Sequence, residues 1–359
     1  MSRISYRSLI AVLLLALPLA AACRPQPAPA PTATRGPEKL IFRNWEGNIS
    51  PEIMQLFTDQ TGIRVEMQPY ESQELAIADL QAGKPADVVV LENQLIPPLI
   101  QTGLLAEIRL TNLPNFKNIS ANFRDLAYDP GNAHSIPYSW GTTGLVFRSD
   151  LPGSQIRRWA DLWDPAYRGR LLGWTLPRYM LGITLKSLGY SLNSEKPQEL
   201  EQAAARLIEL KPAIRLVDWE TAAAAPGLVS GEVWAAVGQA DDVIAAREQG
   251  ARVDYILPEE GGLLWGDNFT IPAASPNQAA AEALINFLLS PEIAARIINE
   301  TFYWLPNDAA LPLVEPQIRD NPAIFPTAQG IKNSEILLPL SPQGEALYQS
   351  AWERFLAAP

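Results

Sequence analysis

The sequence holds one stretch whose residue types and spacing could bind a ligand directly, the run from Gly261 to Pro272. A glycine pair opens it, an apolar run follows, and Trp265 and Asp267 then stand two residues apart. In an extended strand, side chains two positions apart point to the same face. An indole and a carboxylate on one face suit an organic cation, which gains a cation–π contact and a charged hydrogen bond. The alternative is a buried tryptophan beside an aspartate in a surface turn, and this stretch alone leaves both open.

The sequence lacks the residues of several common catalytic and metal sites. His134 is the single histidine, which excludes a metal site built from several histidines. Neither a Gly-x-Ser-x-Gly elbow nor a Gly-x-x-x-x-Gly-Lys-Ser/Thr phosphate loop is present. The adjacent acids Asp241-Asp242 and Glu259-Glu260 are more typical of solvated turns and helix starts than of acid–base catalysis. We therefore predict no enzyme activity, no metal and no cofactor.

Length and composition indicate a globular protein of two domains. The chain has 359 residues, of which 47% are apolar and 19% charged. Without residues 1–22, 26 basic residues face 39 acidic ones, and the net charge is −13. A general nucleic-acid binder needs a basic face, so this class is excluded. An acidic protein can attract cations, but acidic surfaces also serve solubility alone.

The N-terminus has the pattern of an export signal. Arg3 and Arg7 precede an apolar run at 9–20 that is too short to span a bilayer. The small residues before Cys23 resemble a bacterial lipoprotein signal, although Ala20 stands where such signals usually have leucine. We predict that residues 1–22 are a signal peptide and that Cys23, the only cysteine, is lipidated. Residues 23–38 are proline-rich and are predicted to form an extended tether.

The next part of the chain alternates strands and helices, which implies a right-handed α/β layer. One helix is expected to begin at Pro51 after the N-cap Ser50 and to stop at Gly62. The run at 86–91 is apolar almost throughout, as in parallel strands buried on both faces. The expected elements are strands at 40–42, 63–67 and 86–91 and helices at 51–61 and 72–82.

Residues 105–150 are rich in turns and contain a long extended run at 135–147, which we interpret as the passage into a second lobe. Apolar residues at helical spacing predict further helices. The expected helices lie at 178–188, 197–210, 281–288, from 291 and at 344–356. The expected strands lie at 214–217, 233–237, 253–256 and 263–272. The region 305–341 contains several prolines and is expected to wrap around the body.

Eight short runs, in collinear order over residues 39–340, resemble bacterial extracellular solute-binding proteins of the spermidine/putrescine type. These runs are 40–45, 61–65, 70–72, 137–143, 159–163, 258–262, 285–289 and 306–307. The resemblance implies a two-lobe α/β periplasmic-binding-protein (Venus-flytrap) fold with crossing hinge strands. Lobe 1 would comprise 39–143 plus 268–312, and lobe 2 would comprise 144–267 plus 313–359.

The resemblance also implies a pocket in which aromatic rings sandwich a methylene chain and carboxylates hold the ammonium ends. By position, Trp45, Trp265, Asp267 and Tyr303 match residues of that pocket. Nearby acids that could contribute are Glu46, Glu92, Asp241 and Asp242.

Several other pocket positions depart from the pattern. Leu176 and Tyr179 stand where two carboxylates are expected, and a buried ammonium without a partner is costly. Either the nearby acids substitute or the ligand has fewer positive charges than spermidine. The remaining departures are Gly238 for a tryptophan, Gln94 and Asn48 for tyrosines, and Leu337 for a glutamine.

From these features we predict a substrate-binding lipoprotein of an ABC importer. It would capture a small cationic solute, such as putrescine or spermidine, between its lobes and deliver it to a permease. It would be a monomer, anchored by lipid on the periplasmic or cell-surface face of the cytoplasmic membrane. The alternatives are a receptor for another amine or amino-acid-like solute, and a sensory binding subunit.

Overall fold

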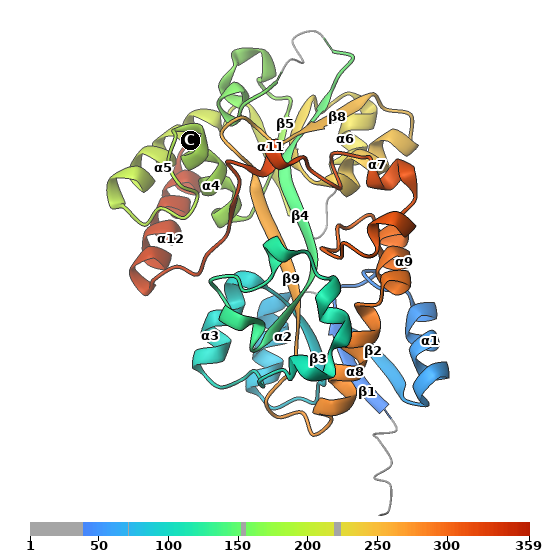
Figure 1. Cartoon of the computed structure of the whole chain (residues 1–359). Coiled ribbons are helices and arrows are strands. Elements are labelled where there is room, and N and C mark those ends of the chain that lie inside the picture. The colour runs from blue at the N-terminus through green and yellow to red at the C-terminus, as the bar shows by residue number, and fades with distance from the viewer. Residues whose placement is uncertain (1–38, 71, 152–155, 219–223) are drawn as a thin grey trace, which may run out of the picture. The chain divides into compact units, whose positions relative to one another are not determined.

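The computed structural model describes residues 39–70, 72–151, 156–218 and 224–359. The predicted signal peptide, Cys23 and the predicted tether lie outside the described residues. The region from Gly36 to Pro359 forms one compact unit. At the centre of its sheet, β4 (Ser135–Arg148) and β9 (Leu263–Thr270) lie side by side and pair antiparallel (Figure 1).

On one side of this central pair, the predicted strand–helix alternation is confirmed. β1 pairs with β2 and β3 in parallel, and β3 pairs antiparallel with β9. Helix α1 has Pro51 in its first turn, and Gly62 ends it with φ 74°. The elements here are β1 (Lys39–Asn44), α1 (Pro51–Thr61), β2 (Arg64–Pro69), α2 (Gln73–Gln81), β3 (Val88–Glu92) and α3 (Ile96–Gln101).

On the other side, β4 pairs with β7 and β8, and β7 leads through β5 to β6. Helix α12 packs against α4 and α5. The elements are β5 (Leu171–Trp174), α4 (Pro177–Ser187), α5 (Pro197–Leu210), β6 (Ile214–Val217), α6 (Ala225–Ser230), β7 (Ala235–Gly238), α7 (Ala240–Glu248), β8 (Val253–Ile256) and α12 (Pro342–Ala357). The predicted strands at 214–217 and 253–256 are confirmed, and the strand predicted at 233–237 lies at β7.

The remaining elements follow β9. Helices α8 (Gln278–Leu288) and α9 (Pro291–Thr301) confirm the two helices predicted there. The region predicted to wrap around the body contains α10 (Pro316–Arg319), α11 (Ala328–Ile331) and the short strand β10 (Glu335–Ile336). No helix among the described residues is long and apolar enough to cross a bilayer.

Separate hydrophobic cores support the division into two lobes. β4 pairs with β9 as far as Thr143 and with β7 from Gly144 onward, so it changes partners at the predicted boundary. Val314, Ile318 and Ile324 belong to the core that contains β1 and α8. We therefore propose that lobe 2 resumes after 324, instead of at the predicted 313.

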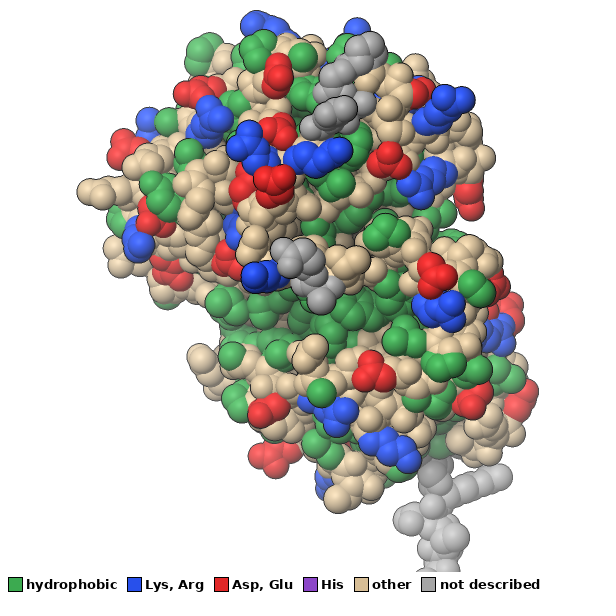
Figure 2. All heavy atoms as spheres, turned by 45° about the horizontal axis from the view of Figure 1, so that its top comes forward, with side chains coloured by type: hydrophobic (Ala, Val, Ile, Leu, Met, Phe, Trp, Pro, Cys, Tyr) green, Lys and Arg blue, Asp and Glu red, His purple; other side chains and the backbone are tan. Residues whose placement is uncertain are grey.

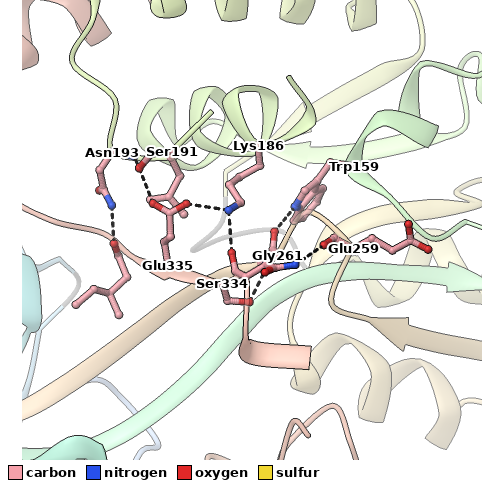
Figure 3. Close-up of polar contacts among 12 residues, drawn as sticks. Trp159, Lys186, Ser191, Asn193, Glu259, Gly261, Ser334 and Glu335 are labelled. Carbon is pink, nitrogen blue, oxygen red and sulfur yellow. Dashed lines mark hydrogen bonds and ion pairs between the residues drawn. The ribbon is translucent and has the colours of Figure 1, made fainter. Parts of the chain in front are cut away.

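The glycine pair that opens β9 is required by a close approach of the chain. Gly261 has φ 94°, and a Cβ placed on it would lie 1.9 Å from the carbonyl oxygen of Asn333. Figure 3 shows the polar network at this approach. Lys186 Nζ donates to the Asn333 carbonyl and to Glu335 Oε1, both at 2.8 Å. Gly262 N donates to Ser334 Oγ at 2.9 Å. These contacts fasten β10 beside the start of β9.

Candidate functional site

Two carboxylates, Asp267 and Glu92, face each other on neighbouring strands near the middle of the sheet. β3 and β9 pair antiparallel, and their register places Glu92 directly opposite Asp267. Residues opposed in this way have Cβ atoms about 4.5–5.5 Å apart and side chains on one face. Two acids therefore lie close together where like charges repel each other.

Asp267 is buried, with 4% of its surface exposed. Its Oδ2 accepts a hydrogen bond from Ser139 Oγ at 3.2 Å, and its Oδ1 accepts a long one from the indole N–H of Trp45 at 3.5 Å. Burial, followed by the charge of Glu92, raises the pKa of Asp267 to about 7. The two hydrogen bonds lower the pKa by less than burial and Glu92 raise it, so the ionised form of Asp267 is less stable here than in water.

Glu92 lies in the same unfavourable environment. Burial raises its pKa, the hydrogen bond from the Gln94 amide opposes this, and the charge of Glu74 adds to the increase. Its backbone N–H donates to Gln73 Oε1 at 2.9 Å. The charged groups that shift the pKa values of Glu92 and Asp267 are acidic, and neither has an ion pair within the described part of the chain. A cation placed here would stabilise both.

Aromatic rings surround this carboxylate pair. Trp45 meets Tyr70 edge to face, with ring centroids 4.8 Å apart. Trp265 meets Tyr303 at 5.6 Å and 89°. A Cβ at Gly141 would lie 2.0 Å from the Trp265 ring, so only glycine leaves space for the indole. Ring faces beside carboxylates can hold the methylene groups and charge of an organic cation.

Tyr303 owes its position to an unusual backbone conformation. Phe302, immediately before it, ends α9 with φ 60°, a region that few residues other than glycine adopt. Burial raises the pKa of Tyr303, and the charges of Asp241 and Asp267 raise it further. Tyr303, which belongs to lobe 1, therefore lies close to acids on α7 and on the crossing strand β9.

Tyr179, in the first turn of α4, is a lobe 2 residue that lies close to the same carboxylate pair. Burial raises the pKa of its phenol, and the charges of Glu92 and Asp267 raise it further. Its ring meets Trp174 edge to face at 5.5 Å. At a position where the resemblance led us to expect a carboxylate, the site therefore has a neutral phenol.

The second acidic pair begins α7. Asp242 is buried and caps the helix: its carboxylate accepts hydrogen bonds from Ala224 N at 2.9 Å and Gln239 N at 3.2 Å. Burial, followed by the charge of Asp241, raises the pKa of Asp242 to about 7. Asp241 remains exposed to solvent, but surrounding protein atoms still raise its pKa by desolvation. Asp242 is thus a structural cap, and Asp241 is the member of the pair that can reach a ligand.

The structure brings most of the predicted site residues together. They are Trp45, Glu92, Gln94, Tyr179, Trp265, Asp267 and Tyr303, with Asp241 near Tyr303. Glu46 differs, because it is exposed in the turn after β1.

Sequence reasoning missed three neighbours of the pair, Tyr70, Gln73 and Ser139. The charges of Asp267 and Glu92 act on Tyr70, whose hydroxyl donates to the Val90 carbonyl at 2.7 Å. Ser139 reaches Asp267 only because β4 pairs with β9 in this register. Register across strands leaves no mark in the sequence, although Tyr70 and Ser139 were both part of runs that carried the resemblance.

An apolar hollow on the surface and the lack of a metal-binding cluster among the described residues both favour an organic ligand. Figure 2 shows hydrophobic side chains gathered in a hollow between two more highly charged regions of this face. Among the described residues, no group of three or more His, Cys, Asp or Glu side chains could hold a metal ion. What this site offers is carboxylates beside aromatic rings.

Comparisons with known proteins point to the same kind of binding protein. The spermidine/putrescine-binding periplasmic protein of Escherichia coli is 34% identical over 82% of this chain and 85% of its own length. The putrescine/agmatine-binding protein of Pseudomonas aeruginosa is 32% identical over 87% of this chain and 90% of its own length.

A solved structure shares the fold. The substrate-binding protein of a spermidine/putrescine ABC transporter from Streptococcus pneumoniae superposes with a TM-score of 0.82, at 30% identity, over 89% of this chain and 98% of that one. The fold is therefore the two-lobe α/β fold of periplasmic binding proteins, as predicted. The family model described as bacterial extracellular solute-binding protein matches residues 52–327, and this chain belongs to that family.

Proposed function

We propose that this protein is the substrate-binding subunit of an ABC importer and captures a small amine of the polyamine class, such as putrescine or spermidine. The pair formed by the buried Asp267 and the partly buried Glu92 carries the proposal. Two desolvated acids without a basic partner favour a cation, and an ammonium group supplies both the charge and the hydrogen-bond donors.

The aromatic residues and Tyr179 support the same ligand class. Trp45 and Tyr303, which both belong to lobe 1, lie beside the acids, and Trp265 lies on the crossing strand β9. The names of the similar proteins from Escherichia coli and Pseudomonas aeruginosa specify polyamines. Because a phenol replaces one expected carboxylate, the site favours ligands with fewer charges than spermidine. This observation keeps another amine or an amino-acid-like solute as the second candidate.

The proposed partners follow from this role. A permease in the membrane would receive the solute, and lipidation at Cys23 with the 23–38 tether would keep the monomeric receptor beside it. This places the protein on the periplasmic or cell-surface face of the membrane. A sensory subunit would use the same pocket but contact a different membrane protein.

Calorimetric titration with putrescine and spermidine tests the proposal. Asp267→Asn removes one member of what would be a buried charged pair, which typically costs about 3–5 kcal/mol. We expect affinity to fall on the order of a hundredfold or more. Trp265→Leu should reduce it roughly tenfold through the loss of a desolvated ring contact.

Glu201→Gln provides the matched control, because it removes one negative charge from the exposed face of α5. It should bind like the unmodified protein, which separates the local role of Asp267 from net charge. Tight binding that survives Asp267→Asn would place the ammonium site elsewhere.

A further inference from the structure

We propose that the preferred ligand carries a neutral hydrogen-bond acceptor in addition to its ammonium group, as does an amine whose other end is capped as an amide. This inference rests on the proposed function, since it concerns the same site. It comes from buried donors beside the carboxylate pair that a fully protonated polyamine cannot satisfy.

Gln73 supplies the first donor. It begins α2, and only 5% of its surface is exposed. Its Oε1 accepts the backbone N–H of Glu92, and this bond fixes which end of the amide is oxygen. Nε2 is then a buried donor that has no partner among the described residues. This donor belongs to a side chain that is hydrogen-bonded to the backbone of Glu92, one of the two site acids.

Trp265 supplies the second donor. Its ring packs over Gly141 and against Tyr303, and its Nε1 is buried without a partner within the described part of the chain. An indole N–H can only donate. Asn93, next to Glu92, is the opposite case: its Oδ1 is a buried acceptor that has no partner among the residues the structure describes.

The two unpaired donors indicate which polar groups the ligand should carry. A protonated polyamine has donors only, so Gln73 Nε2 and Trp265 Nε1 would stay unpaired on binding, which is unfavourable for buried groups. An acceptor on the ligand would supply the partner that either donor needs. A carboxylate acceptor would be repelled by Glu92 and Asp267, so the acceptor is neutral.

The lobe 2 residues fit a ligand with one charged end. Tyr179 places a phenol where a carboxylate would hold a second ammonium group. Both carboxylate oxygens of Asp242 already accept backbone N–H groups, and Asp241 is exposed to water. Neither acid of α7 therefore requires a second ammonium group.

Two amines of equal chain length test this inference by calorimetry. N-acetylputrescine has one ammonium group and an amide carbonyl, whereas heptylamine has the ammonium group and no carbonyl. We expect N-acetylputrescine to bind at least about tenfold more tightly, as expected for sites whose buried polar groups need a partner.

Gln73→Glu tests the residue. It keeps an oxygen for the Glu92 N–H but replaces the donor with an acceptor. The preference for N-acetylputrescine over heptylamine should fall at least about fivefold, and putrescine should bind more tightly. Gln349→Glu is the matched control, since it adds the same charge on the exposed face of α12 and should change neither ratio. Circular dichroism would verify that each variant is folded.

The outcomes separate the two proposals. Equal affinities for N-acetylputrescine and heptylamine, with tight binding of putrescine or spermidine, would overturn this inference and support the proposed function. An unchanged preference in folded Gln73→Glu would overturn the role of Gln73. If none of these amines bound, both proposals would fail.

Discussion

At the scale of single residues, the proposed role of Asp267 would link stability to ligand binding. A buried aspartate without a basic partner destabilises the folded protein unless a proton or a cation neutralises it. Its pKa of about 7 means that a proton does so in mildly acidic solution. Above that pH, the proposed ammonium ligand would take over the same role, so affinity and ligand-free stability should change in opposite directions with pH.

This gives a prediction for the ligand-free protein. The pKa of Asp267 is near 7 in the folded chain and 3.8 in the reference state. Between these values the folded state holds a proton that the unfolded state lacks, so stability falls as pH rises towards 7. Relative to the unmodified protein, Asp267→Asn should gain about 2–4 kcal/mol in the free energy of unfolding between about pH 5 and pH 8. Urea titration at both pH values measures this.

The exposed substitution Glu201→Gln controls for the general effect of losing an acid. It should follow the unmodified protein at both pH values. If Asp267→Asn showed the same pH dependence as Glu201→Gln, Asp267 would not carry the proton.

The sequence predicted only part of this residue arrangement. Trp265 and Asp267 were recognised from their spacing, and the strand that this spacing required is β9. Glu92 and Gln94 came from the family resemblance. Gln73 was missed because it reaches Glu92 through a side-chain hydrogen bond from α2, and Ser139 because it reaches Asp267 through strand register. Strand periodicity reports neither.

At the scale of elements, the approach of β10 to the start of β9 depends on Gly261. Gly261→Ala would place a side chain at φ 94° and against the Asn333 carbonyl. The left-handed backbone alone costs about 1–2 kcal/mol, and the contact adds to this. We expect the free energy of unfolding to decrease by more than about 2 kcal/mol. Thermal or urea unfolding measures it.

Gly83→Ala separates the two contributions. Gly83 also has a positive φ, 72°, but a Cβ there would meet nothing within 4 Å. Its substitution should show the backbone contribution alone. Equal losses in both variants would mean that β10 can move away from β9 without penalty.

Element boundaries were predictable where the chain marks them chemically. α1, α5 and α9 all have proline in the first turn, and Gly62 ends α1 in the left-handed conformation. β10 was not predicted, because two residues are too short for a periodic pattern and its partner lies some 70 residues away in the sequence. The network around Lys186 and Glu335 holds it in place.

At the scale of the whole molecule, the site draws on both lobes. Glu92 comes from β3 in lobe 1 and Tyr179 from α4 in lobe 2, and β4 continues from one group of strands into the other. Ligand should therefore favour a closed arrangement of the lobes. We expect a saturating amine to reduce the radius of gyration in solution scattering and to change the emission of Trp45 and Trp265.

Asp267→Asn at the same amine concentration is the control for closure, because it should stay open until more ligand is added. A proven ligand that saturates the protein without changing the scattering curve would rule out this motion.

The position of β9 also determines when the protein can fold. In the sheet, β9 stands between β3 and β4, yet it follows both of them in the sequence by more than a hundred residues. Until residues 263–270 are available, β3 and β4 each lack the strand that pairs with one of their edges, and such long-range pairing is slow to form. A chain that appears N-terminus first therefore cannot complete its central sheet until β9 has appeared. During the proposed export, that delay would favour an incompletely folded chain while its N-terminal part crosses the membrane.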